Sequence, residues 1–170
     1  MKSNIIDQIS TWTGKAVAWL IPVLIVELVY DTIARYIFNA PTEWSYDISY
    51  MLYGTIFMLG SAYTLLIEEH VRIEIIYGKV SPKSKAIIDA ICYILFFFPS
   101  IGALLYFGGK FALRSWQMLE ASGVSMWSPP IYPFKTIIPL AAILLMAQGI
   151  VKFVRCIVLI FGEKEDDLKS

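Results

Sequence analysis

Four long apolar segments constrain the fold of this chain more than any other feature of its sequence. They cover residues 15–38, 44–67, 86–109 and 132–161. A helix needs about 20 apolar residues to cross a bilayer, and each segment reaches that length. The connections between them are too short for a separate soluble domain, and 58% of all residues are apolar. The sequence therefore predicts one all-α integral membrane domain of four transmembrane helices.

The four segments differ in how strongly they indicate a membrane span. The second and third contain uncharged cores at residues 48–67 and 90–109. The first is interrupted by charges. The fourth has a shorter uncharged core, residues 136–151, which gains length if Lys152 extends its amine to the membrane surface.

The positive charges predict the orientation. Four spans place both termini and the middle connection on one side, and ten of the 14 Lys and Arg residues fall there. Because positive residues concentrate in the cytoplasm, both termini are expected to be cytoplasmic. Residues 1–14 fit either an interfacial helix or an extension of the first span, and residues 110–121 leave the same two alternatives open outside.

Two further expectations concern helix ends. A helix running from Pro82 through residue 121 exceeds the bilayer thickness, so it should tilt, kink at Pro99 or continue as an interfacial helix, ending at Gly123. The charged tail, residues 163–170, is predicted to be disordered.

Three charges interrupt the first span at four-residue intervals: Glu27, Asp31 and Arg35. This spacing places them on one stripe of a helix. A charge near the bilayer centre costs at least about 2.5 kcal/mol, so the stripe should face protein, or water enclosed by protein. Three roles stay open for it: ion pairs that set helix register, contacts with another subunit, or an ion or proton site.

A tight turn follows the first span. Thr42 is expected to cap the second helix, with Glu43 in its first turn and Trp44 as an interfacial anchor. The short connection predicts that Arg35, Glu43 and Asp47 meet at the outer interface.

The outer connection before the fourth span is rich in proline and aromatic residues. Trp127, Pro129 and Tyr132 indicate a stiff loop at the outer interface, serving either as an interfacial belt or as a docking surface for an external protein. In the fourth span, Gln148 and Gly149 are suited to helix contact.

Residue chemistry excludes several function classes. His70 is the only histidine, and Cys92 and Cys156 lack metal-ligand spacing, so no haem, metal or catalytic site is expected. The net charge is zero, which gives no reason to expect nucleic-acid binding.

Several blocks together resemble one family. They are Arg35 to Pro41, followed by Trp44 and an acidic residue three positions later; Gly60 to Tyr63; His70 to Glu74; and Trp127 to Lys135. This pattern is similar to the small membrane subunit of tripartite ATP-independent periplasmic (TRAP) transporters, the DctQ family, over nearly the whole chain. Asp47 departs from it, since family members often have Glu there.

The resemblance implies a role within a three-component system. A periplasmic solute-binding protein would capture an organic acid, and a large membrane subunit would hold the sodium and substrate sites and move like an elevator. The small subunit, embedded in lipid in the bacterial inner membrane, would brace the large one. Its interface would include Glu27, Asp31, Arg35, Glu43, Trp44 and Asp47.

A different function class remains open from the residues alone. Small multidrug exporters also have four spans and one glutamate in the first span, which Glu27 could imitate in a dimeric, proton-coupled pump. Against this, those chains are shorter and lack the neighbouring charges and the long outer loop.

Overall fold

The computed structural model describes residues 5–67 and 82–166, except the side chains of residues 82–83 and 162–166. Within these residues the chain forms helices joined by short connections, and its only β-type pairing is an isolated bridge between Ala121 and Pro130. The middle connection around His70 lies outside the described residues. The all-α prediction is therefore confirmed for the described part of the chain.

The first helical rod is longer than expected. It comprises α1 (Ile5–Ala18) and α2 (Leu20–Tyr36), interrupted only at Trp19. Pro22 accounts for the interruption, because it has no N–H to bond the carbonyl of Ala18. Together the two helices form a 32-residue stretch long and apolar enough to cross a membrane. Residues 5–14 thus continue in helix toward the first span, with one interruption at Trp19.

The second segment forms α3 (Ser45–Leu66). Its 22 residues would extend about 33 Å, a spanning length. Three helical stretches in the described part are both long and apolar enough for a span, namely Ile5–Tyr36, Ser84–Met118 and Tyr132–Phe161. Helix α3 is not among them, because its many Tyr, Ser and Thr residues lower its mean hydropathy.

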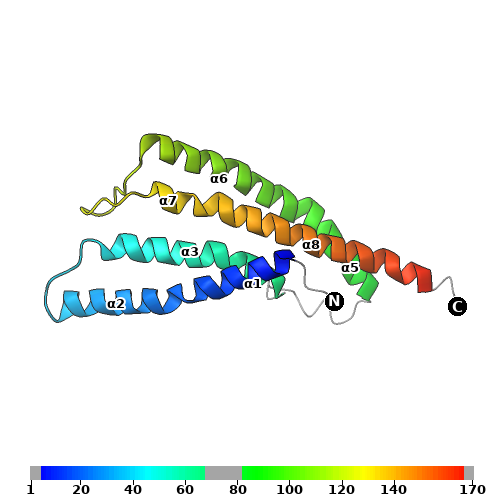
Figure 1. The fold of residues 1–170 in the computed structure, drawn as a ribbon, viewed down its shortest axis with the longest axis horizontal. Helices are drawn as coiled ribbons and strands as arrows, with labels where there is room; N and C mark the ends of the chain where they lie inside the picture. Colours follow the sequence, from blue (N-terminus) through cyan, green and yellow to red (C-terminus); the bar gives the residue numbers. More distant parts are fainter. Residues whose placement is uncertain (1–4, 68–81, 167–170) are drawn as a thin grey trace.

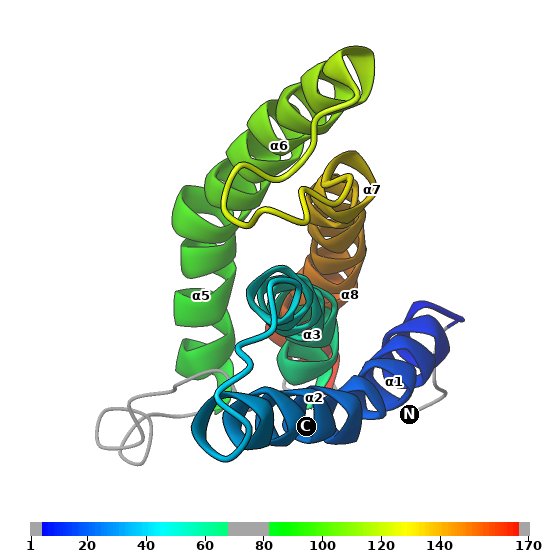
Figure 2. The same cartoon turned by 90° about the vertical axis from the view of Figure 1, so that its left-hand side faces the viewer.

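The third rod bends at a π-helical turn. It consists of α5 (Pro82–Cys92), η1 (Tyr93–Phe97) and α6 (Phe98–Met118), and Figure 2 shows the change of direction between α5 and α6. The wide turn precedes Pro99, whose ring and missing N–H disturb the α-helical bonding. A bend beside this proline was one of the expected alternatives. The helix ends at Met118, with Leu119 as its left-handed C-cap (φ 46°), and not at Gly123.

The fourth rod consists of α7 (Tyr132–Lys135) and α8 (Ile137–Asp166). Its apolar stretch, Tyr132–Phe161, has the same bounds as the predicted span. The interruption at Thr136 is explained by Pro139, which cannot bond the Lys135 carbonyl. Helix α8 continues to Asp166, into the first part of the tail that was expected to be disordered.

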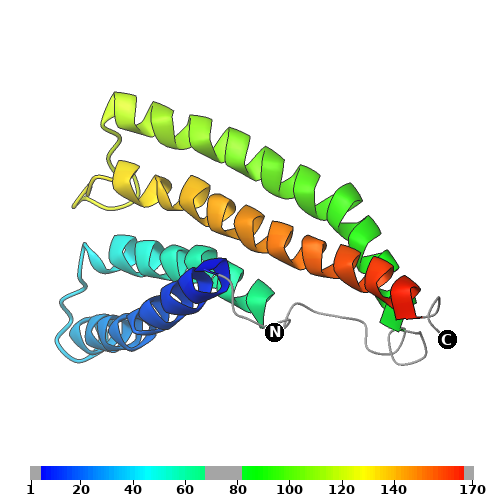
Figure 3. The same cartoon turned by 45° about the vertical axis from the view of Figure 1, so that its right-hand side comes forward.

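The rods lie side by side in the order α6, α8, α3 and α2, as Figures 1 and 3 show. Along α2 this arrangement is an open row, whereas at the opposite end α1 packs on both α3 and α8. Helices α1 and α5 add to it at the end opposite the outer connections, where α1 packs on α3 and α5 packs on α8. The small core lies where α3 meets α8, around Ala62, Leu65 and Leu145.

Candidate functional site

The glutamate of the first span is buried between α2 and α3. Glu27 is 8% exposed, and its carboxylate accepts hydrogen bonds from Ser45 and from Ser49, the latter at 2.6 Å. Hydroxyl donors compensate part of the cost of burying a carboxylate. The protein contact that was expected to cover this charge is therefore supplied by α3 of the same chain.

The other two charges of the stripe form an ion pair. Arg35 donates to Asp31 at 2.9 Å, and Thr42 donates to the second oxygen of the same carboxylate. The Arg35 side chain remains 50% exposed. Because Thr42 bonds Asp31, it does not cap α3 as expected; Trp44 occupies the N-cap position without a side-chain cap bond and stacks on Tyr30.

A cavity of about 410 Å³ opens beside this ion pair. Its walls combine charged, hydroxyl and aromatic side chains of α2 and α3. The lining residues are Leu28, Asp31, Arg35, Ser45, Tyr46, Ser49, Tyr50 and Tyr53. The cavity is therefore an opening between α2 and α3 where charged and hydroxyl groups lie beside aromatic rings.

Asp47 binds a different part of the chain than expected. It is 2% exposed and accepts hydrogen bonds from Ser122, at 2.5 Å, and from Ser125. Glu43 is exposed, and Arg35 pairs with Asp31. The predicted meeting of Arg35, Glu43 and Asp47 is wrong, because the connection after α6 folds over the start of α3 and supplies the partners of Asp47.

This outer connection is a small hairpin. Ser122 N–H donates to the Pro129 carbonyl at 2.8 Å, and Ile131 N–H donates to the Glu120 carbonyl at 3.0 Å. Lys135 closes its base by binding the Glu120 carboxylate at 2.5 Å. That hydrogen bond is the main reason why the pKa of Glu120 lies below its usual value.

The three residues predicted to dock an external protein occupy different environments. Trp127 lies near the hairpin tip and is half exposed. Pro129 is buried, and Tyr132 packs on Trp116 with ring centroids 4.4 Å apart. Trp127 is therefore the member of this set most accessible to an external partner.

A buried polar network joins α1 to α8 at the opposite end. Gln148, fully buried, donates to Asp7 at 3.1 Å and accepts from Ser10 at 3.0 Å. Arg155 also binds Asp7. This confirms helix contact for Gln148, and Lys152, one turn further along α8, is only 8% exposed.

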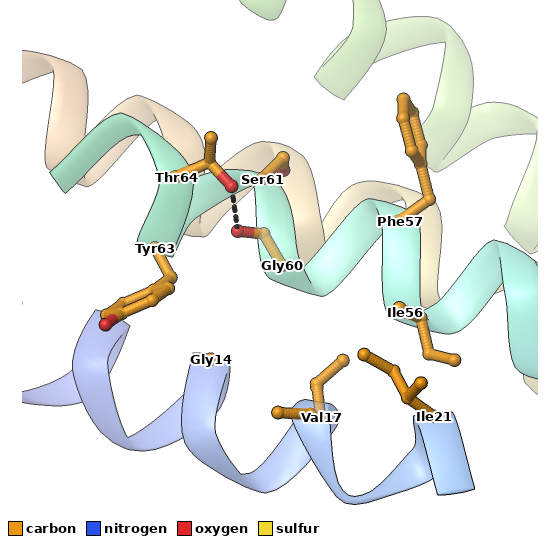
Figure 4. A pocket seen from close by; sticks show the side chains of 10 residues that line it. Gly14, Val17, Ile21, Ile56, Phe57, Gly60, Ser61, Tyr63 and Thr64 are labelled. Atoms are coloured by element: carbon orange, nitrogen blue, oxygen red, sulfur yellow. Dashed lines mark hydrogen bonds between the residues drawn. The ribbon is translucent and has the colours of Figure 1, made fainter. Parts of the chain in front are cut away.

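A crevice of about 460 Å³ lies beside the interruption at Trp19. Figure 4 shows Val17 and Ile21 facing Ile56 across it, and Gly14 beneath Tyr63. Gly14 allows this approach, since a Cβ there would lie 2.5 Å from the Tyr63 ring. The crevice is mostly apolar and holds no cluster of titratable groups.

No group of three His, Cys, Asp or Glu side chains within the described residues could hold a metal ion. The polar contacts above join helices to one another.

In a comparison with known protein families, the model of the tripartite ATP-independent periplasmic transporters, DctQ component, matches residues 9–159. The chain belongs to the DctQ family.

Membership in the DctQ family confirms the resemblance inferred from the sequence. This DctQ chain is thus a transporter component and a membrane protein. A comparison with curated protein sequences found no match. The findings give no support to the alternative of a self-sufficient multidrug exporter.

Sequence reasoning missed several residues that organise this DctQ chain. Asp7 was overlooked because its partners, Gln148 and Arg155, lie more than a hundred positions away. Ser45 and Ser49 could have been found, since two serines four residues apart share a helix face and can serve a carboxylate. Pro22 was the available signal for the interruption at Trp19.

Proposed function

We propose that this chain is the small membrane subunit that braces the large elevator subunit of a TRAP transporter in the bacterial inner membrane. In this role it crosses the membrane four times, with both termini in the cytoplasm. The sodium and substrate sites belong to the large subunit, and a periplasmic binding protein delivers an organic acid to it. The chain itself carries out no catalysis.

The observation that carries this proposal is the open row of helices. Among the described residues, helix α2 sits at one end of the row and has α3 and α1 as its main packing partners. A chain that transports alone needs an enclosed pathway between helices, whereas a brace needs broad faces for a partner. The buried Glu27 supports the same reading, because Ser45 and Ser49 occupy its carboxylate as they would in a structural contact.

The outer hairpin supports a contact with the periplasmic binding protein. Its tip exposes Val124, Met126 and Trp127, an apolar group suited to protein contact. Asp47 and Lys135 hold the hairpin in place from below. A rigid support reduces the ordering cost of binding.

Affinity purification of the tagged chain from membranes that also express the large subunit tests this proposal. We expect the two subunits to elute together as one complex in mild detergent. Elution of this chain alone as a homodimer, with the large subunit in a separate fraction, would contradict the proposal. That result would instead support the alternative of a multidrug exporter.

A further inference from the structure

Helix α3 carries a row of exposed aromatic side chains on one face. Tyr46, Tyr50, Tyr53 and Phe57 follow one another at spacings of three and four residues, which places them on one stripe. They are 55–64% exposed. We call these four residues the aromatic strip.

The chemistry of the aromatic strip does not suit lipid tails. Within the described residues, the hydroxyls of Tyr46, Tyr50 and Tyr53 donate no hydrogen bond. The backbone of Tyr53 lies about 12 Å further along the helix axis than that of Ser45. This places it deeper in the membrane than the interface where tyrosines usually lie. A hydroxyl without a partner in hydrocarbon costs free energy, so a polar partner should cover it.

Arg35 borders the same strip. It lines the cavity of about 410 Å³ together with Tyr46, Tyr50 and Tyr53. A guanidinium has five N–H donors, and within the described residues Arg35 bonds only Asp31. Arg35 therefore has donors left for a partner at the edge of the strip.

Tyr53 and Phe57 continue the strip toward the crevice described above. Their rings stack with centroids 6.4 Å apart, and Phe57 lines that crevice. At Gly60, one turn further, a Cβ would meet nothing within 4 Å. The surface thus runs from a cavity that contains charged and hydroxyl groups, near the start of α3, to a mostly apolar crevice near its end.

We propose that the aromatic strip, with Arg35 at its edge, is the surface on which a transmembrane helix of the large subunit docks. This inference rests on the proposed function and specifies its interface. The partner helix would be apolar opposite Phe57 and would present hydrogen-bond acceptors to the tyrosine hydroxyls and to Arg35. A lipid tail offers none of these acceptors.

Site-specific photocrosslinking tests the interface. The photoreactive residue p-benzoylphenylalanine replaces Tyr53 in one variant and Phe107 in α6 in the other; the two native side chains are 63% and 66% exposed. After co-expression with the large subunit and irradiation of intact membranes, we expect Tyr53 to crosslink to the large subunit and Phe107 not to do so.

The outcomes separate the two proposals. Copurification of the subunits with crosslinking at Phe107 but not at Tyr53 would overturn this inference and leave the proposed function standing. Crosslinking of Tyr53 to a second copy of this chain or to lipid would also overturn it. No copurification and no crosslink at either position would contradict both proposals.

A second measurement isolates the hydroxyl groups. The double variant Tyr50→Phe and Tyr53→Phe keeps the rings, so its fold should be unchanged. We expect the dissociation constant for the large subunit to rise roughly tenfold, the effect of losing two hydrogen bonds. Tyr106→Phe in α6, at 56% exposure and with its hydroxyl bound by Lys110 of the same helix, is the control and should leave it unchanged. Equal affinities for all three proteins would overturn the inference.

Discussion

Asp47 of α3 and Ser122 of the connection after α6 form a buried hydrogen bond of 2.5 Å between positions 75 residues apart. Ser125 binds the other oxygen of the same carboxylate. These contacts tie the α2–α3 hairpin to the outer hairpin. Asp47 therefore joins the two halves of the helix row at its outer end.

The variant Asp47→Asn should destabilise the chain. It replaces one acceptor oxygen by an amide donor, which leaves one serine hydroxyl without an acceptor, and the expected cost is about 1–3 kcal/mol. Unfolding in mixed detergent micelles measures it. Glu43→Gln, at an exposed position, is the control and should stay within about 0.5 kcal/mol of the parent. Equal losses in both variants would contradict the role assigned to Asp47.

Gly149 should be intolerant of a methyl group. A Cβ at this position would lie 2.1 Å from the Phe97 ring, so Gly149→Ala is expected to cost about 1–3 kcal/mol through overpacking. Adding Phe97→Leu should recover part of that loss. In contrast, Gly109 has nothing within 4 Å of a Cβ, and Gly109→Ala should be neutral or stabilising. Comparable unfolding of both alanine variants would refute the close packing.

Arg35→Ala should weaken assembly with the large subunit. The side chain is half exposed and has unused donors beside the aromatic strip. We expect less large subunit to copurify with this variant, while Arg114→Ala on exposed α6 should leave the yield unchanged. Normal copurification together with lost transport would rule out the assembly explanation.

The Glu120–Lys135 contact should respond to acid. The pKa of Glu120 is lowered from 4.5 by its hydrogen bond from Lys135, so the ionised form favours the folded hairpin. This contribution to the stability of the folded hairpin is fully present above the ordinary pKa of a glutamate. It is lost as the pH falls through the lowered pKa of Glu120. Amide exchange at Ser122 and Ile131 should therefore speed up relative to other amides only below about pH 4.5. Glu120→Gln should remove that step, and a step that persists would assign it to another group.

The sequence predicted those features that depend on local composition. The bounds of the fourth span follow from hydropathy, and the burial of Glu27 follows from the cost of a charge in hydrocarbon. The outer hairpin could not be predicted, because the pairing of Asp47 with Ser122 depends on how α6 and α8 place that connection. The link from Asp7 to Gln148 was hidden for the same reason. Helix α3 was expected to be one of the two strongest spans; it has the length of a span, but its Tyr, Ser and Thr residues keep it out of the three stretches that are apolar enough to cross a membrane.

Solute uptake into reconstituted vesicles tests the central claim most directly. Vesicles that contain only this chain are compared with vesicles that contain it together with the large subunit, both supplied with the binding protein, an organic acid and a sodium gradient. The account predicts uptake only in the second preparation. Sodium-driven or proton-driven flux through vesicles holding this chain alone would contradict the claim that it is a brace and not a carrier.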